Sequence, residues 1–323
     1  MVRRLVGGLV AAVLVVAAAT AADAGGHTWS KVRTATSPGP RASFAMAYDG
    51  ARGEAVLFGG TPGGGLLLGD TWTFSGGEWT EASPERSPLA RTGAAMAYDE
   101  ARGEVVLYGG RTDRGLAGDT WTWDGATWTR ERPAASPPAR FGARMAFDPA
   151  TGRLVLFGGN VFETVLDETW AWDGRTWQQL HPSTSPAPRS LPGMETDPAR
   201  GQVVLFGGNA GAAGEVYGDT WVWNGSTWVR RRPPVAPEAR DGMGMAWDAA
   251  LGAVVLFGGT DVESAWHDDT WAWDGSAWLR LDPGRHPSAR SDLGMVSYGG
   301  RPLLFGGVAF FDAFRGDTWG FRS

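Results

Sequence analysis

Short runs of apolar and polar residues follow one another along the chain in a fixed order. Residues 91–99, RTGAAMAYD, alternate as in a strand that has one buried face. The tight turn EARGE leads to VVLYGG, a continuous apolar run that ends in two glycines, as is typical of a strand buried on both faces. A variable stretch, DTWTW, a turn at Asp124-Gly125 and TWTRERP then follow. This order predicts four short antiparallel strands, a to d, joined as hairpins.

The same unit recurs six times, at spacings of 49 to 51 residues. An arginine opens each unit, with a proline three residues before it and a methionine five residues after it. The six arginines are Arg41, Arg91, Arg140, Arg189, Arg240 and Arg290. A fixed period of this length indicates a repeat architecture in which each unit buries its apolar surface against its neighbours.

Tryptophans explain how the units stack. Of the 18 tryptophans, 16 occupy repeat positions, which marks them as core. Trp121 and Trp123 project from one face of strand c, and Trp123 and Trp128 face each other across the c–d hairpin. A four-stranded sheet with large apolar groups on both faces needs a neighbour on each side. Stacking of the sheets around a central axis gives every sheet two neighbours. The sequence therefore predicts an all-β, six-bladed β-propeller of four-stranded antiparallel blades.

The two ends of the chain predict how the ring closes. The sixth unit ends at DTWGFRS, directly after its strand c. The missing strand d is found at the other end, where GGHTWSKV (25–32) matches DGATWTRE (124–131). We therefore expect the N-terminal strand to complete the last blade.

The repeat resembles the Kelch repeat. The double glycine after an apolar strand, the WxW that follows and a further tryptophan five residues on carry the resemblance, which covers residues 25–323. The chain departs from the family where tryptophan replaces the usual tyrosine and where the sixth unit has a shortened first turn. The replacing tryptophans are Trp123, Trp172, Trp223 and Trp273. The resemblance implies a binding module or an enzyme, since Kelch propellers serve as both.

Charge and cysteine content exclude several functions. The formal net charge of −6 provides no general basic surface for nucleic acid. The absence of cysteine rules out disulfides, thiolate metal sites and the cysteine–tyrosine crosslink of the copper-radical oxidases built on Kelch propellers. The four histidines show no metal-binding spacing. We therefore expect no metal and no cofactor.

Residues 1–24 resemble an export signal. Arg3 and Arg4 precede an apolar stretch over 5–19, and Ala22-Asp23-Ala24 forms an A-x-A cleavage site. A retained membrane anchor is the alternative, because the apolar stretch is nearly long enough to span a bilayer. We expect cleavage and a secreted, monomeric propeller over residues 25–323, without stable insertion in the membrane.

Variable loops indicate where a ligand would bind. The a–b and c–d turns are uniform, whereas the b–c loops on the opposite face differ in every blade and carry large apolar residues. We expect a carbohydrate or a protein to contact this b–c/d–a loop face, or else these side chains fold back and cap the blades. The candidates are Phe162, Glu163, Tyr217, Trp266, His267, Phe310, Phe311 and Phe314, with Arg140 and Arg189 from the arginine set.

The repeated arginines have a simpler explanation than ligand binding. An acid begins strand c at the same end of every blade, so a structural ion-pair set is favoured, with one or two arginines also touching a ligand. The acids are Asp70, Asp119, Glu168, Asp219, Asp269 and Asp317.

Two departures from the repeat place charged residues where a catalytic site could lie. Strand a carries small residues where it borders the central channel, but Arg144 and Glu195 break this rule in blades three and four. Mutual pairing across the blade junction is the first hypothesis, since an unpaired buried charge is costly. The alternative function places them at the channel mouth of a sugar isomerase, mutarotase or lyase, because exported Kelch sialic-acid mutarotases imply that an acid and an arginine suffice for proton transfer on a sugar.

Overall fold

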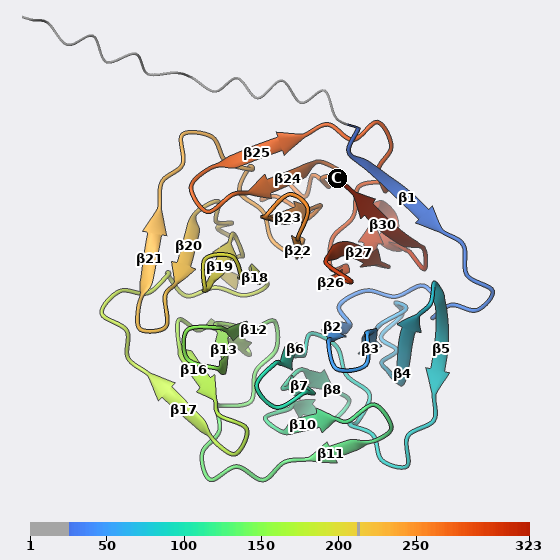
Figure 1. The fold of residues 1–323 in the computed structure, drawn as a ribbon. Helices are drawn as coiled ribbons and strands as arrows, with labels where there is room; N and C mark the ends of the chain where they lie inside the picture. The colour runs from blue at the N-terminus through green and yellow to red at the C-terminus, as the bar shows by residue number, and fades with distance from the viewer. Residues whose placement is uncertain (1–25, 212–213) are drawn as a thin grey trace, which may run out of the picture.

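Six four-stranded antiparallel sheets surround a central axis in the computed structural model, which describes residues 26–211 and 214–323 (Figure 1). Strand a of each blade lies innermost and contacts strand a of both neighbouring blades. The predicted six-bladed propeller is therefore confirmed. The predicted export signal, residues 1–24, lies outside the described residues.

The strands follow the predicted order a to d in every blade. Blade one comprises β2 (Ala45–Asp49), β3 (Glu54–Gly60), β4 (Leu68–Ser75) and β5 (Glu78–Ala82). Blade two comprises β6 (Ala95–Asp99), β7 (Glu104–Tyr108), β10 (Thr120–Trp123) and β11 (Trp128–Arg130). Blade three comprises β12 (Arg144–Asp148), β13 (Arg153–Phe157), β16 (Thr169–Trp172) and β17 (Trp177–Leu180). Blade four comprises β18 (Gly193–Asp197), β19 (Gln202–Phe206), β20 (Thr220–Trp223) and β21 (Trp228–Arg231). Blade five comprises β22 (Gly244–Asp248), β23 (Ala253–Phe257), β24 (Thr270–Trp273) and β25 (Trp278–Leu281). Blade six comprises β26 (Gly294–Tyr298), β27 (Arg301–Phe305), β30 (Thr318–Arg322) and β1 (Thr28–Val32).

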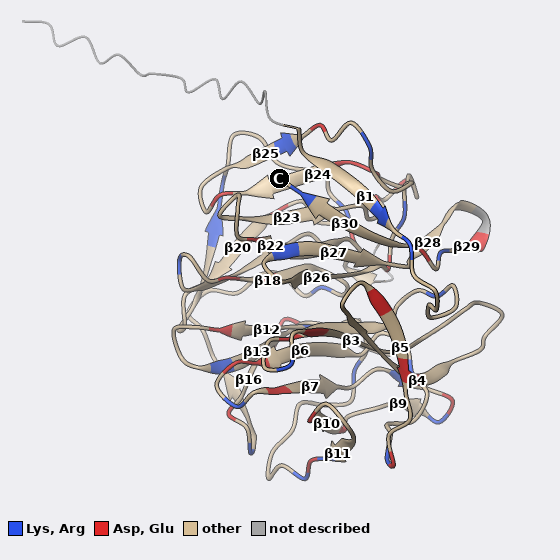
Figure 2. Cartoon of the chain, turned by 45° about the vertical axis from the view of Figure 1, so that its right-hand side comes forward, with Lys and Arg blue, Asp and Glu red and all other residues tan. Residues whose placement is uncertain are grey.

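Some b–c loops contain short hairpins of their own. These are β8 (Arg111–Thr112) with β9 (Gly115–Leu116), β14 (Asn160–Val161) with β15 (Thr164–Val165), and β28 (Val308–Ala309) with β29 (Ala313–Phe314), the last pair joined by the 3₁₀ turn η2 (Phe310–Asp312). In Figure 2 the β28–β29 hairpin stands out from the body of the ring. Within the described part of the chain, no helix has the length and apolar character needed to cross a membrane.

The N-terminal strand closes the ring, as predicted. β1 pairs with β30 in antiparallel register, with Trp29 opposite Phe321, and Figure 1 shows the blue β1 along the red β30. Trp29 is fully buried and its ring contacts Phe257 of blade five. The last blade therefore joins both ends of the described chain.

Paired aromatic rings fill the space between blades. Trp123 and Trp128 face each other across the c–d hairpin, with ring centroids 5.4 Å apart, which confirms the predicted pairing. Blades three to five repeat this tryptophan pair, and blade one has Phe74 and Trp79 in its place. Both rings of the Trp123–Trp128 pair are buried, as are those of the other pairs. These rings form much of the apolar core.

A closed belt of backbone hydrogen bonds encircles the axis just before the innermost strands. In each blade the residue two positions after the repeated arginine donates its N–H to the carbonyl of the equivalent residue in the preceding blade, at N···O distances of 2.7 to 3.1 Å. Each of these residues has positive φ, and three of them are not glycine. The six residues are Ser43, Gly93, Gly142, Leu191, Gly242 and Asp292. The belt lies at the b–c loop end of the innermost strands, and none of its six residues lines the central cavity.

Candidate functional site

A central cavity of about 570 Å³ lies along the axis, between the six innermost strands. Its lining at the a–b turn end, including Gly50, Glu100 and Pro198, is exposed, whereas Phe44 and Met243 near the hydrogen-bonded belt are buried. The cavity therefore opens on the face of the a–b turns. This is the face opposite the variable loops on which the sequence analysis expected a ligand.

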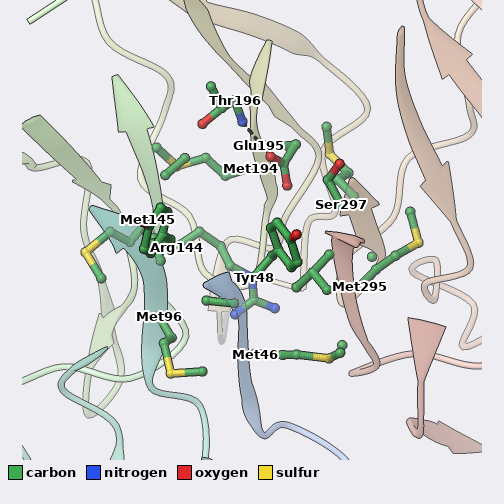
Figure 3. Close-up of a pocket in the computed structure, with 18 of the residues that line it drawn as sticks. Met46, Tyr48, Met96, Arg144, Met145, Met194, Glu195, Thr196, Met295 and Ser297 are labelled. Atoms are coloured by element: carbon green, nitrogen blue, oxygen red, sulfur yellow. Dashed lines mark hydrogen bonds between the residues drawn. The ribbon is translucent and has the colours of Figure 1, made fainter. Parts of the chain in front are cut away.

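Small residues at the start of strand a leave room for methionines of the next blade. A Cβ added to Gly193 would lie 2.3 Å from the sulfur of Met245, and one added to Gly294 would lie 2.8 Å from the sulfur of Met46. Blade three has Arg144 at this position instead. Its long side chain extends into the cavity, among the methionines that line it (Figure 3).

Arg144 carries its charge deep in the channel without a close counter-ion. No carboxylate of the described residues lies within 4.0 Å of its guanidinium nitrogens. Loss of hydration lowers the pKa of Arg144, and the nearby charges of Asp292 and Asp241 oppose this shift. The guanidinium thus remains available for hydrogen bonds with a molecule that enters the cavity.

Asp292 and Asp241 come from the loops that enter strand a in blades six and five. Desolvation raises the pKa of Asp292 to about 6, and Arg144 opposes the rise. Desolvation also raises the pKa of Asp241, whose carboxylate accepts hydrogen bonds from Asn209 (2.7 Å) and Thr260 (3.3 Å). Neither acid was predicted from the sequence as part of the site. A comparison of the repeats one and two positions after the arginine would have found them, since the other blades have no acid there.

Glu195 faces the same cavity from β18. Its Oε1 accepts a hydrogen bond from the N–H of Thr196 at 3.0 Å (Figure 3). Desolvation raises the pKa of Glu195 to about 8, and repulsion from Glu100 adds to the shift. The hypothesis that Arg144 and Glu195 pair with each other is wrong, because no ion pair joins them and their electrostatic partners are different groups. Both side chains instead face an open cavity.

Aromatic rings flank the open end. Tyr48, Tyr98 and Trp247 line the cavity and are half-buried, each near the end of an innermost strand. Tyr48 packs edge-on against Tyr298, with centroids 5.6 Å apart, so its ring has a fixed orientation. The cavity thus combines charged groups in its interior with aromatic surface at its mouth.

The repeated arginines belong to the fold. Arg189 donates to both carboxylate oxygens of Asp219 at 2.6 and 3.1 Å and to the carbonyl of Gly207 at 2.9 Å. Arg140 donates to one carboxylate oxygen of Glu168 and to the carbonyl of Gly158. The other four blades repeat the arrangement. Arg140 and Arg189 are only 1% and 0% exposed, and their donors serve these internal bonds. Neither arginine lines the central cavity.

The sequence comparison agrees with this architecture. A family model described as the KLHDC2/KLHL20/DRC7 Kelch-repeats domain matches residues 5–190 and again residues 77–234. The chain belongs to the Kelch-repeat family. Among curated proteins, none matches this Kelch chain. Kelch propellers generally act as binding modules for protein partners, and the family places this chain in that broad class.

The loop face of the Kelch propeller carries two largely exposed phenylalanine side chains. Phe162, at the tip of the β14–β15 hairpin, is 79% exposed, and with the exposed Glu163 it borders an open hollow beside Pro138. Phe310 is also largely exposed, at 61%. These residues stand where the sequence analysis expected ligand contacts, and that role stays a prediction.

Other loop candidates contact the ring itself. Phe314 is half-buried, and its ring lies where a Cβ on Gly63 of blade one would be, 2.6 Å away. The guanidinium of Arg189 lies 4.2 Å from the centroid of the Tyr217 ring. Phe314 and Tyr217 thus cover neighbouring parts of the fold, as the capping hypothesis expects. The side chain of Phe311 lies outside the described residues.

Trp266 and His267 occupy the b–c loop of blade five. Both are half-buried, and the backbone at Trp266 bridges to Thr260. The Nε2 atom of His267 lies 3.4 Å from a carboxylate oxygen of Asp261. None of the loop candidates borders the central cavity, so the structure separates the candidates into two groups at opposite ends of the ring.

Proposed function

We propose that this Kelch propeller binds a small carbohydrate in its central cavity. The observation that carries the proposal is that Arg144, which has no ion pair among the described residues, and Glu195, which accepts only the backbone N–H of Thr196 there, both face a cavity of about 570 Å³. Cavities of roughly 300–1,000 Å³ with a few convergent polar groups are typical of small-molecule sites. The cavity therefore has both the size and the polar groups that a mono- or disaccharide needs.

The chemistry of the lining favours a sugar over an apolar ligand. A guanidinium donates to sugar hydroxyls, and the carboxyl group of Glu195 accepts from them. The rings of Tyr48 and Trp247 at the mouth offer aromatic surface for the C–H faces of a sugar. Arg144 also favours a ligand that carries a carboxylate, although Asp292 and Asp241 reduce this preference.

Thermal unfolding in the presence of sugars tests the proposal. Neutral sugars, uronic acids and sialic acid are compared at increasing concentration, and a ligand at 100 times its Kd stabilises the fold by about 2.7 kcal/mol. We expect at least one sugar to raise Tm in the wild type and to lose this effect in Arg144→Ala. Phe162→Ser, which changes the loop face alone, serves as the control and keeps the effect. A shift that survives Arg144→Ala and disappears in Phe162→Ser would move the site to the loops.

A catalytic role is a second candidate, favoured by Glu195. A carboxyl whose pKa is raised to about 8 exists in both protonation states near neutral pH and is suited to general acid–base transfer. Mutarotation requires only proton transfers to and from the hydroxyl and ring oxygens of the sugar. The rate of anomer exchange of a bound sugar, measured by NMR, would fall in Glu195→Gln if Glu195 transfers the proton. An exchange rate equal to that in buffer would show that the protein binds the sugar without catalysing its mutarotation.

We also propose that the protein acts outside the cytoplasm after removal of residues 1–24. The A-x-A site at Ala22-Asp23-Ala24 supports cleavage. On the loop face, Phe162 and Phe310 are suited to contact a protein partner, in keeping with the general role of Kelch propellers. The mass of the exported protein would show whether it begins at Gly25.

A further inference from the structure

Three side chains with metal-binding atoms meet on the loop face of blade five. Glu238 lies in the loop that leads into β22, and Asp261 and His267 lie in the loop between β23 and β24. One ligand atom from each of the three lies within 4.8 Å of the other two. Atoms bound to one ion at about 2.0–2.2 Å lie at most about 4.4 Å apart, so small rotations of these side chains would bring all three atoms onto a single ion.

The histidine of this cluster lacks a hydrogen-bond partner. The Nε2 atom of His267 is buried, and no hydrogen bond satisfies it within the described structure. Oδ1 of Asp261 accepts the N–H groups of Glu263 and Ala265, both at 2.9 Å, and this leaves Oδ2 facing His267. A buried imidazole nitrogen beside a free carboxylate oxygen is an arrangement that a cation would complete.

Comparison of the blades shows that the cluster belongs to blade five alone. At the position of His267, two residues before the acid of strand c, the other blades have Leu68, Ala117, Leu166, Tyr217 and Arg315. At the position of Asp261 they have Pro62, Thr112, Val161, Ala210 and Ala309, and at that of Glu238 they have Gly39, Leu89, Pro138, Ala187 and Ser288. The repeat does not require any of the three side chains, so the fold alone does not explain them.

We propose that Glu238, Asp261 and His267 form a divalent metal site on the loop face. One imidazole with two carboxylates suits a borderline cation such as Zn²⁺ or Co²⁺, whereas Ca²⁺ prefers oxygen ligands throughout. Three protein ligands leave a coordination position for water or for a group of a bound partner. The site lies away from the central cavity and is independent of the carbohydrate proposal.

Calorimetric titration of the full chain, without a histidine tag, tests the site with Zn²⁺. We expect the wild type to bind one Zn²⁺ and the Asp261→Asn variant to bind it at least about tenfold more weakly, since even an outer partner of a metal ligand contributes that much. The asparagine keeps an oxygen for the turn at Glu263 and Ala265 and removes the oxygen that faces the histidine. Thermal unfolding in a chelator, unchanged in the variant, shows that the fold is intact.

Histidines elsewhere provide the controls. His181→Ala, at an exposed position after β17, keeps the wild-type affinity, and His267→Ala loses it. His286 lies 3.8 Å from Asp268 and is the competing location. The proposal is overturned if the wild type does not bind Zn²⁺, if Asp261→Asn binds it equally well, or if His286→Ala rather than His267→Ala removes the binding.

Discussion

Each strand c begins with an acid, a threonine and a tryptophan, and each of the three residues makes a different contact. In blade one, Asp70 binds Arg41 and also accepts the indole N–H of Trp72 at 2.7 Å. Thr71 accepts the indole N–H of Trp128, at 2.9 Å, from the neighbouring blade. All six blades have this inter-blade bond, at distances of 2.9 to 3.1 Å. The threonine thus links adjacent blades where the tryptophan rings meet.

Replacement of one such threonine measures the strength of this link. Thr220 is buried and accepts from Trp278, so Thr220→Val keeps the shape and leaves a buried indole N–H without a partner. We expect a loss of about 1–3 kcal/mol in the free energy of unfolding, measured with urea. Thr129→Val, on the exposed side of β11, should change it by less than about 0.5 kcal/mol. Equal effects at the two sites would show that the hydrogen bond contributes nothing.

Glu195 makes stability depend on pH. The folded chain holds its proton up to about pH 8, whereas the unfolded chain releases it near the usual glutamate pKa of about 4.3. Between these values unfolding releases a proton, so the contribution of Glu195 to stability falls as pH rises and then levels off above pH 8. Glu195→Gln removes this contribution and should gain stability relative to the wild type from pH 5 to pH 8.

Urea unfolding at pH 5, 6.5 and 8 checks this expectation. One such group can change the free energy of unfolding by up to about 1.4 kcal/mol per pH unit. Glu163→Gln, at an exposed hairpin tip, is the matched control and should follow the wild-type profile. Parallel profiles for Glu195→Gln and the wild type would mean that Glu195 is ionised throughout this range.

At the scale of elements, β1 is the strand that completes the last blade and closes the ring. It is the outer strand of the last blade, and it alone brings residues from the start of the described chain into that blade. Its anchor is Trp29, which is fully buried and donates to Thr270 of blade five at 3.1 Å. Loss of this anchor would leave the edge of β30 unpaired and the junction with blade five open.

Trp29→Ala should therefore destabilise the whole ring. Truncation of a buried tryptophan typically reduces the free energy of unfolding by about 3–5 kcal/mol. Urea unfolding measures the loss, and hydrogen exchange should show faster exchange in β30 than in β16 of blade three, on the opposite side of the ring. Lys31→Ala, at an exposed position of the same strand, is the control. Unchanged exchange in β30 would show that the blade holds without its outer strand.

Sequence patterns predicted the elements well because the repeat determines them. The strands, the Trp123–Trp128 pair and the closure by β1 depend on spacings that recur in every unit. The site was harder to predict. Arg144 and Glu195 were recognised as departures from the repeat, but their separation depends on how neighbouring blades are rotated about the axis, and no spacing along the chain encodes that rotation.

The whole molecule has two ends with different chemistry. The a–b turn end opens into the cavity with Arg144 and Glu195, while the other end presents exposed Phe162 and Phe310. Basic and acidic residues are interspersed along the blades in Figure 2, so charge alone does not distinguish the two ends. A small molecule in the cavity and a partner on the loops could therefore be bound at the same time, since the belt of backbone hydrogen bonds lies between them.

The direction of the hydrogen bonds in that belt also matters for the number of repeat units in the ring. All six of its hydrogen bonds run in the same sense, from each blade to the one before it, and the first blade donates to the last. Duplication of a unit would add one donor and one acceptor to this circuit and reverse none of the existing bonds. The sense of these bonds therefore does not specify the number of blades. Packing between neighbouring blades, such as that of Met245 against Gly193, also constrains how the units fit together.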